Sequence, residues 1–289
     1  IGGNWFGHPA KEMTMIAVTG TCGKTTTTYL LKAILEQARG VKVGLIGTNQ
    51  NMIGSDVIPT ERTTPESFEV QKLFREMADA GCTHVVMETS SHALYLDRVY
   101  GVRYDVGIFT NLTQDHLDFH KTMENYCDAK AILFRNCVTG VVNADDPWTP
   151  WLLKDADCKV MTYAEQADAD LRAENIVLSA GGIAFDAVSG AERVPIRVNI
   201  PGGFMVYNTL DVLGAALALY HLFADGEQYG EIYGCAADRA NAGQCFDTAV
   251  GMIDQCPALK KRCKLKISQK EIYDTVSHSC DKALSAHAG

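Results

Sequence analysis

The sequence predicts an α/β fold built on a mostly parallel sheet. Short apolar runs alternate with segments whose apolar residues recur at helical spacing, which is typical of strand–helix–strand units. A glycine-bearing turn joins the first apolar run to the first helical segment, and polar stretches follow later apolar runs. Ligands of open parallel sheets bind beyond the carboxyl ends of the strands. We therefore expect the functional residues in the polar stretches that begin at Thr19, Glu88 and Thr110.

The predicted elements follow in chain order over the first half of the sequence. They are strands over 13–19, 41–46, 85–87, 106–109 and 138–142, and helices over 25–38, 65–80 and 126–136. The first helix carries apolar residues at helical spacing, namely Leu30, Leu31, Ile34 and Leu35. The second starts near Pro65, which favours a helix N-terminus, and we expect apolar residues on one side of it: Phe68, Leu73, Phe74 and Met77.

The pattern changes after residue 169. Short alternating segments around Gly181 and Gly182 predict a small antiparallel addition up to residue 200, and an Ala- and Leu-rich helix is expected over 204–223. The stretch 219–289 holds five of the ten cysteines and a basic cluster over 260–266. No motif assigns this stretch, and we expect two or three helices in it. The chain is thus divided into a domain over 1–218 and an unassigned tail.

Composition excludes several classes of function. The 289 residues carry a net charge of −9, which gives no support for nucleic-acid binding. No apolar run is long enough for a membrane span, and no Cys-x-x-Cys pair occurs. The cysteines therefore indicate free thiols in a reducing cytoplasm. The chain does not begin with Met, so we interpret it as a fragment or processed form, and we expect a monomer.

A phosphate-binding loop is predicted between the first strand and the first helix. Its residues are Gly20, Thr21, Cys22, Gly23, Lys24, Thr25 and Thr26. Backbone N–H groups of such a turn point at phosphate oxygens, Lys24 would reach the β- and γ-phosphates of ATP, and the Thr25 hydroxyl would hold Mg²⁺. The full P-loop ATPase pattern fails at Val18, where it requires glycine. The alternative is a glycine turn with a chance lysine.

Two further polar stretches suggest metal ligands. Glu88 follows a buried strand, where its carboxylate could bind the Mg²⁺ held by Thr25. His116 and His120 lie four residues apart and could bind zinc, but no third soft ligand has suitable spacing. The nearby Asp115 and Asp118 suit a harder metal, and a purely structural role for His116 is a further alternative.

Lys130 lies on an apolar helix, within Ala-Lys-Ala-Ile-Leu-Phe. Such a lysine usually extends its ammonium group into solvent. If it is buried instead, desolvation lowers its pKa and makes it nucleophilic, so that it could take up CO₂ and become an anionic carbamate ligand. The sequence leaves both readings open.

Taken together, these motifs resemble the Mur ligase family. In order and spacing, the chain carries Gly-Thr-Cys-Gly-Lys-Thr-Thr, Thr-Thr-Pro-Glu from Thr63, Met-Glu-Thr-Ser-Ser-His, Asn-Leu-Thr-Gln-Asp-His-Leu-Asp-Phe-His and Ala-Lys-Ala-Ile-Leu-Phe. The resemblance covers about residues 4–218 and is closest to the members that add the third residue of the peptidoglycan stem peptide. It implies that residues 1–218 are the family's central ATP-binding domain.

The resemblance also implies a reaction and a set of residue roles. Members use ATP to turn the carboxylate of UDP-N-acetylmuramoyl-L-alanyl-D-glutamate into an acyl phosphate, which an incoming amino acid converts to an amide. By resemblance, Lys24 and Thr25 contact the phosphates and Mg²⁺, and Glu88 binds the first Mg²⁺. His116 and carbamylated Lys130 belong to a second Mg²⁺ site. Contacts to the UDP-muramyl dipeptide are implied for Thr63, Thr64, Ser90 and Arg98, and an adenine contact for Asn208.

The sequence departs from the family at several places. Cys22 and Met205 stand where Asn is usual, and Leu96 replaces a polar residue. The family's N-terminal UDP-binding domain and its C-terminal amino-acid-binding domain, with its Asn-Pro-Arg type motif, are not found. We therefore expect the isolated chain to bind ATP–Mg²⁺ weakly and to ligate nothing.

Three alternative functions remain at this point. One is folylpolyglutamate synthetase or another Mur ligase, against which Thr63-Thr64-Pro65 argues. The second is an inactive, truncated nucleotide-binding remnant. The third is an unrelated P-loop ATPase, which the stretches around His116 and Lys130 disfavour.

Overall fold

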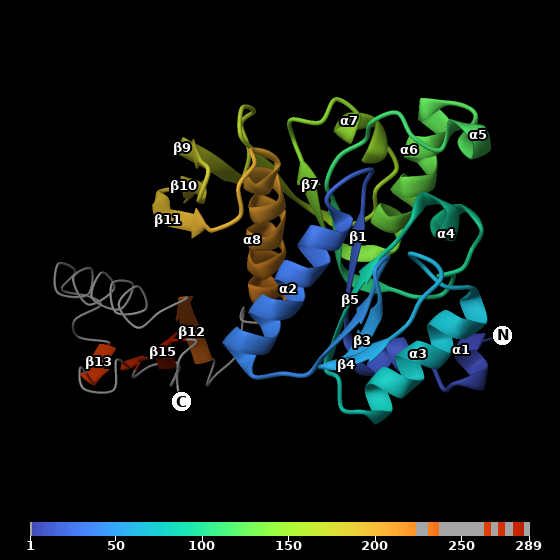
Figure 1. Cartoon of the computed structure of the whole chain (residues 1–289), viewed down its shortest axis with the longest axis horizontal. Coiled ribbons are helices and arrows are strands. Elements are labelled where there is room, and N and C mark those ends of the chain that lie inside the picture. Colours follow the sequence, from blue (N-terminus) through green and yellow to red (C-terminus); the bar gives the residue numbers. More distant parts are fainter. Residues whose placement is uncertain (1, 224–230, 237–262, 267–270, 275–279, 286–289) are drawn as a thin grey trace. The chain divides into compact units, whose positions relative to one another are not determined.

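The structure is a computed structural model that describes residues 2–223, 231–236, 263–266, 271–274 and 280–285 (Figure 1). The described residues fall into two compact units, one of residues 1–33 with 41–219 and the other of residues 34–40 with 220–289. Among the described residues, no helix is both long enough and apolar enough to span a membrane.

The first unit is built on an eleven-stranded sheet with the order β11-β10-β9-β8-β7-β6-β1-β5-β2-β3-β4. Its strands are β1 (Thr14–Thr19), β2 (Val43–Ile46), β3 (Asn51–Ile53), β4 (Asp56–Ile58), β5 (His84–Glu88), β6 (Tyr104–Phe109), β7 (Cys137–Asn143), β8 (Lys159–Ala164), β9 (Leu171–Ser179), β10 (Gly182–Ser189) and β11 (Glu192–Val198). The central strands, in the spatial order β9-β8-β7-β6-β1-β5-β2, all pair in parallel. This confirms the predicted mostly parallel α/β fold.

Antiparallel strands extend the sheet at both ends. The predicted addition consists of β10, paired with β9 and β11. At the other end, β3 and β4 form a hairpin that the sequence analysis missed, turning at Gly54 with φ 60°. Each of its strands has only three residues, too few to establish an alternating pattern.

Helical segments connect the strands. They are α1 (Gly2–Trp5), η1 (Pro9–Glu12), α2 (Lys24–Arg39), α3 (Ser67–Asp79), α4 (Ser91–Tyr95), α5 (Leu117–His120), α6 (Met123–Ala131), η2 (Ile132–Arg135), α7 (Thr149–Leu152) and α8 (Phe204–Phe223). In Figure 1, α2 and α8 run side by side. The Thr27 hydroxyl of α2 donates to the Asp211 carboxylate of α8 at 3.0–3.1 Å, which joins the two helices.

The apolar core lies between the central strands and their helices. Strands β1, β5 and β6 are almost entirely buried, which explains their continuous apolar runs. In α3, Leu73, Phe74 and Met77 are buried as expected, but Phe68 is 55% exposed. The prediction for Phe68 was wrong because it lies five residues before Leu73, away from that face, and its ring instead contacts Phe6 at 5.2 Å between centroids.

In the second unit, the described tail residues form a four-stranded sheet in the order β12-β15-β14-β13. The strands are β12 (Glu231–Ala236), β13 (Cys263–Lys266), β14 (Glu271–Asp274) and β15 (Cys280–Ser285). The expected helices are therefore wrong for these residues. Stretches such as Cys-Lys-Leu-Lys alternate with a period of two, which favours strands over helices. The rest of that prediction beyond Phe223 lies outside the described residues.

Candidate active site

The turn between β1 and α2 requires its two glycines. Gly20 has φ 146°, and a Cβ there would lie 1.9 Å from the Thr110 hydroxyl oxygen. Gly23 has φ 93°, and its Cβ would lie 2.6 Å from Oδ1 of Asn208. Because only glycine fits this conformation and this spacing, the backbone can close tightly around the start of α2. The free N–H groups of the first helical turn then face the loop opening, as anion binding requires.

The segment after β6 holds this loop in place. The backbone carbonyl of Asn111 accepts from the Thr21 N–H at 2.8 Å. The Asn111 side chain accepts from the Cys22 N–H at 3.0 Å through Oδ1, and its amide nitrogen donates to the Cys22 carbonyl at 3.1 Å. Thr110 also donates to the Cys22 carbonyl, at 2.6 Å. Sequence analysis placed both residues in a polar stretch expected to be functional, at the carboxyl end of β6, but gave neither of them a role. Cys22 contributes through its backbone, so a cysteine side chain is compatible with the loop.

Lys24 lies folded over the loop. Its ammonium group donates to the Gly20 and Thr21 carbonyls, each at 2.9 Å. Burial lowers the pKa of Lys24, while the neighbouring Glu88 carboxylate opposes that shift. The side chain is therefore held within reach of the position where the loop N–H groups would receive a phosphate.

Glu88 lies across the loop from Lys24, as the pairing of β5 with β1 at Val18 places it. Its carboxylate is fully buried and accepts from the Thr25 hydroxyl at 3.0 Å. It also accepts from the Thr48 N–H at 2.9 Å and from the Thr48 hydroxyl at 2.8 Å. Thr48 was missed, because nothing in the sequence distinguishes it beyond its position after a predicted strand.

These oxygen donors fit Mg²⁺. The Thr25 hydroxyl and the Glu88 carboxylate lie next to each other, and hard cations prefer such oxygen ligands over sulfur or nitrogen. Oε1 of Glu88 accepts from both Thr25 and Thr48, whereas Oε2 accepts only from the Thr48 hydroxyl and keeps a lone pair for a cation.

Lys130 is not a solvent-facing lysine. It is 1% exposed, and its ammonium donates at 2.9 Å to the Gly20 carbonyl, the same oxygen that Lys24 contacts. It also lies 4.5 Å from the centre of the Tyr126 ring. Burial, and next the positive charge of Lys24, lower the pKa of Lys130 well below its ordinary value. The structure thus places a readily deprotonated amine beside the phosphate loop.

Tyr126 connects Lys130 to the loop and to the histidines. The residue is buried, and its hydroxyl lies 3.3 Å from the Thr21 hydroxyl. The His120 ring stacks on the Tyr126 ring at 5.0 Å between centroids, and the His116 ring lies edge-on at 6.1 Å. Sequence analysis did not single out Tyr126, because a tyrosine at helical spacing is ordinarily a core residue.

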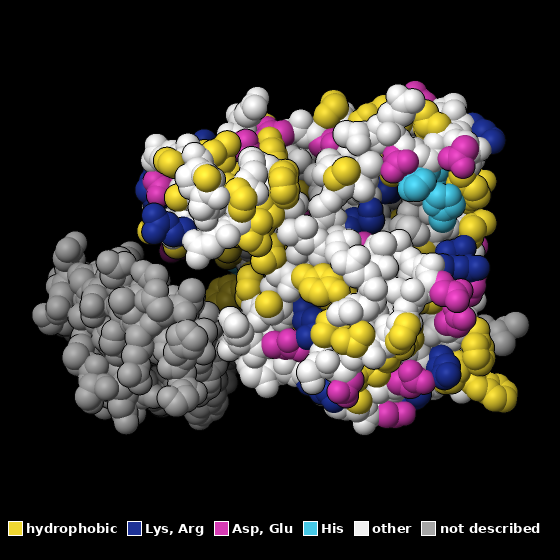
Figure 2. Space-filling model, viewed as in Figure 1, with side chains coloured by type: hydrophobic (Ala, Val, Ile, Leu, Met, Phe, Trp, Pro, Cys, Tyr) yellow, Lys and Arg dark blue, Asp and Glu magenta, His cyan; other side chains and the backbone are white. Residues whose placement is uncertain are grey.

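The histidines form an aromatic cluster on the surface near α4 and α5, cyan in Figure 2. His92 packs against His116 at 4.9 Å and against His120 at 5.3 Å between ring centroids. His120 is buried and hydrogen-bonds the Ser91 hydroxyl at 2.9 Å, and burial lowers the pKa of His120 to about 4. Among the described residues, no group of three His, Cys, Asp or Glu side chains could hold a metal, so the zinc alternative finds no support.

His116 is more exposed than His120, with which the sequence analysis paired it. It is half-exposed and adopts a left-handed conformation with φ 51°, which turns its ring toward Tyr126. Lys24, Thr25, Glu88, Lys130 and His116 therefore all lie around the phosphate loop, on the carboxyl edge of the sheet.

The four candidate substrate residues lie next to this centre. Thr64 is buried, and its hydroxyl donates to the Glu88 carbonyl at 2.9 Å and accepts from the Ser90 N–H at 3.1 Å. The Ser90 hydroxyl caps α4 by accepting from the Ala93 N–H. Both hydroxyls therefore have structural partners, whereas Thr63 contacts the exposed Thr48 hydroxyl at 3.1 Å.

Arg98 lies beside these threonines. One guanidinium nitrogen donates to the Thr64 carbonyl at 3.2 Å, and another pairs with Glu66 at 3.0 Å. Its Nε is buried with no partner among the described residues. Because Nε is buried, contact with an anionic substrate would fall to the two terminal nitrogens.

Asn208, the candidate adenine contact, lies on α8 beside Gly23 and is 5% exposed. Its amide nitrogen lies 3.8 Å from the sulfur of Met205. The carboxamide therefore borders the phosphate loop from the side of α8.

Comparison with known proteins assigns this arrangement to a family. A model of the Mur ligase middle domain matches residues 18–216, which is more than half of the chain. The chain belongs to the Mur ligase family. The matched region contains every candidate site residue named above.

Curated relatives and solved structures agree with this membership. The UDP-N-acetylmuramoyl-L-alanyl-D-glutamate–2,6-diaminopimelate ligase of Clostridium botulinum is 51% identical over 214 residues, which cover 74% of this chain and 44% of the relative. A ligase of that name from Clostridium perfringens is 44% identical over 225 residues, covering 76% and 45%. The chain thus spans less than half the length of these Mur ligases.

Among solved structures, a ligase of the same name superposes with a TM-score of 0.69 at 26% identity, covering 86% of this chain and 57% of that one. MurF from Acinetobacter baumannii superposes with a TM-score of 0.62 at 22% identity, covering 75% and 46%. The second likeness shows the shared fold.

Proposed function

We propose that this chain is the ATP-binding central domain of a cytoplasmic ligase that adds an amino acid to UDP-N-acetylmuramoyl-L-alanyl-D-glutamate in peptidoglycan synthesis. Two curated relatives, 51% and 49% identical, are named for that substrate and for 2,6-diaminopimelate as the amino acid. The observation that carries the proposal is the convergence of Lys24 and Lys130 on the Gly20 carbonyl, opposite the Thr25–Glu88 pair.

ATP binding is assigned to the phosphate loop. The N–H groups at the start of α2 receive phosphate oxygens, and Lys24 exchanges its two carbonyl contacts for them. Thr25 and Glu88 would hold Mg²⁺, which when bound would neutralise phosphate charge. Because Glu88 is fixed by Thr48, its carboxylate needs little rearrangement to take up this role.

The ligation follows from bringing two anions together. The substrate carboxylate attacks the γ-phosphorus of ATP, so that ADP leaves and an acyl phosphate forms. The amine of the amino acid then attacks the acyl carbon, loses a proton, and phosphate leaves. Lys24 and Arg98 lower the repulsion between the carboxylate and ATP, and the protein contributes mainly by positioning and by charge neutralisation.

Lys130 is assigned a carbamate. Its lowered pKa provides the neutral amine, which attacks CO₂, and a proton is released as the N–C bond forms. The anionic product would relieve the repulsion with Lys24 and, with His116, would offer ligands for a second Mg²⁺.

The experiment places residues 18–216 of this chain in the Clostridium botulinum ligase, in exchange for its own matching segment. We expect this chimera to release ADP over many turnovers only when both UDP-N-acetylmuramoyl-L-alanyl-D-glutamate and 2,6-diaminopimelate are present. Mass spectrometry should then detect the amide product. A folded chimera that binds ATP but forms no product would contradict the proposal. Activity with a folate substrate in place of the muramyl one would favour the folylpolyglutamate synthetase alternative.

A further inference from the structure

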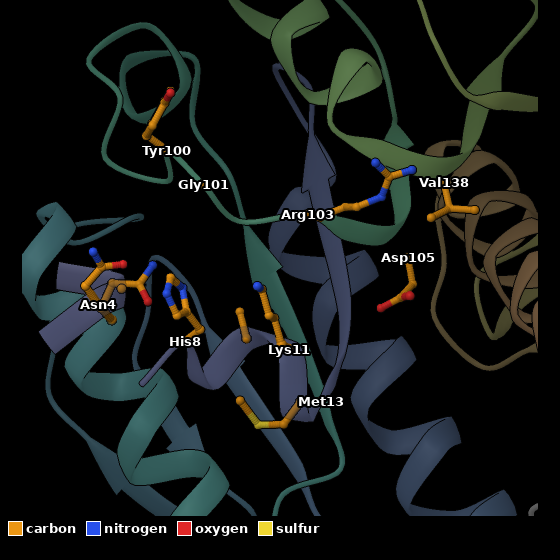
Figure 3. A pocket seen from close by; sticks show the side chains of 12 residues that line it. Asn4, His8, Lys11, Met13, Tyr100, Gly101, Arg103, Asp105 and Val138 are labelled. Carbon is orange, nitrogen blue, oxygen red and sulfur yellow. The ribbon is translucent and has the colours of Figure 1, made fainter. Parts of the chain in front are cut away.

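A cavity lies at the edge of the sheet opposite the phosphate loop. It has a volume of about 440 Å³, and its lining comes from residues 3–13, from α3, from residues 100–105 and from the start of β7 (Figure 3). These segments surround the amino ends of β1, β6 and β7, whereas the phosphate loop follows the carboxyl end of β1. Because these strands are parallel, the cavity is separate from the active site. Its volume is in the range of small-molecule sites.

The charged side chains of this cavity are mostly positive. Lys11, Arg103 and Asp105 are its charged lining residues, and in Figure 3 the Arg103 guanidinium extends toward Val138. Within the described part of the chain, neither Lys11 nor Arg103 has an ion pair or a side-chain hydrogen bond. Asp105 already accepts from the Met15 N–H at 2.7 Å through one oxygen. An excess of positive charge in a chain of net charge −9 favours an anionic occupant.

Gln71 provides a second and independent indication of a ligand. This residue of α3 is only 7% exposed and lines the cavity. Its amide has no hydrogen-bond partner among the residues that the structure describes. Its Oε1 lies toward Gly3, another lining residue, where a Cβ would be 3.8 Å away. The amide atoms are not themselves sealed from solvent, so they are free to bond a group that enters the cavity.

The alternative is that Lys11 and Arg103 are ordinary solvated cations. That alternative explains their exposure but not why the mostly buried Gln71 presents an unbonded amide at the same cavity. His8 strengthens the case for a shaped site, because it is held in a left-handed conformation with φ 57° and its N–H donates to the Gly3 carbonyl at 2.7 Å. The chain from Gly3 to Lys11 is thereby folded around the cavity.

We propose that this cavity is a second ligand site, which binds a small anion that also carries hydrogen-bond donors. Its carboxylate or phosphate group pairs with Lys11 and Arg103, and its donor groups bond to Oε1 of Gln71 and to the unused oxygen of Asp105. The site is independent of the ligase proposal, because none of its residues belongs to the phosphate loop.

The test is isothermal titration calorimetry on the full chain carrying Lys24→Ala, which disables phosphate binding at the loop. The probes are L-glutamate, with carboxylates and an ammonium donor, and glycerol 3-phosphate, with a phosphate and hydroxyl donors. Ionic strength is matched with NaCl. The tested changes are Lys11→Ala, Arg103→Ala and Gln71→Leu, and the matched control is Lys159→Ala, an exposed lysine at the start of β8. Circular dichroism checks that each variant is folded.

We expect saturable binding of one of the two probes, and the probe that binds identifies the site as one for carboxylates or for phosphates. Lys11→Ala and Arg103→Ala should each weaken it about tenfold or more, since each removes a charged hydrogen bond, while Lys159→Ala should leave it unchanged. Gln71→Leu should weaken it as well. The proposal is overturned if neither probe saturates, or if binding is indifferent to Lys11 and Arg103.

Discussion

Replacing Lys130 with Arg tests the chemistry proposed for the buried amine. Lys130 is 1% exposed, and its ammonium donates to the Gly20 carbonyl, which Lys24 also contacts. Arginine keeps the positive charge but stays protonated, so it cannot form a carbamate. In the chimera, we expect Lys130→Arg to lower the rate of ADP release at least about 100-fold, which corresponds to about 2.7 kcal/mol of transition-state stabilisation.

The assay measures ADP release at saturating ATP, UDP-muramyl dipeptide and bicarbonate. Lys154→Arg is the matched control, because Lys154 also lies over an aromatic ring, at 4.3 Å from the centre of the Trp151 ring, but is exposed and remote from the loop. Near-normal turnover of Lys130→Arg would refute the carbamate and would leave the second Mg²⁺ site in need of another ligand.

Two further measurements separate a lost ligand from a packing defect, since arginine is also larger than the space that Lys130 occupies. Lys130→Ala should regain part of its activity when a short carboxylic acid is added, because the acid can take the carbamate's place. In ¹³C-bicarbonate, the wild-type chimera should show a carbamate signal by ¹³C NMR that Lys130→Ala lacks. No rescue and no signal would leave Lys130 a buried structural lysine.

Three other expectations follow from the structure. Because the pKa of Lys130 is lowered in the fold, the folded chain binds fewer protons than the unfolded chain. The free energy of unfolding should therefore rise with pH, up to about pH 10, by at most about 1.4 kcal/mol per pH unit. Lys130→Met should remove this rise, as measured by denaturation at several pH values. Burial raises the pKa of Asp211, so its ionised form destabilises the fold at neutral pH, and Asp211→Asn should stabilise the chain by about 1 kcal/mol at pH 8 and by less at pH 5 in thermal unfolding. Gly20→Ala should abolish ATP binding in a fluorescent-nucleotide assay because its Cβ would collide with Thr110, whereas Gly181→Ala, with open space around it, should not.

The position of the glycine turn and of the Thr25–Glu88 pair beside it could be predicted because the signals are local. Gly20 to Thr25 form one continuous motif, and Glu88 stands directly after an apolar run, so strand order alone brings it to the loop. The apolar runs of β1, β5 and β6 likewise specify buried parallel strands. What the sequence could not show is the set of partners that arrive from elsewhere in the fold.

Thr48 and Tyr126 illustrate that limit. Thr48 fixes the Glu88 carboxylate only because β2 pairs with β5, and a lone threonine after a short strand carries no distinguishing pattern. In the sequence, Tyr126 has the spacing of an ordinary helical core residue. Its contacts with Thr21 and Lys130 depend on how α6 packs. The strands of the tail were missed for a different reason, since a period-two alternation over only four residues, as in Cys263–Lys266, is easily overlooked.

The central claim, that this chain carries a working nucleotide site, is tested most directly by titrating the chain with ATP in the presence of Mg²⁺ by calorimetry. The structure predicts weak but saturable binding that Lys24→Ala abolishes and that Lys159→Ala leaves unchanged. Binding that fails to saturate, or that is the same with and without Lys24, would contradict the assignment of the β1–α2 turn as the phosphate loop.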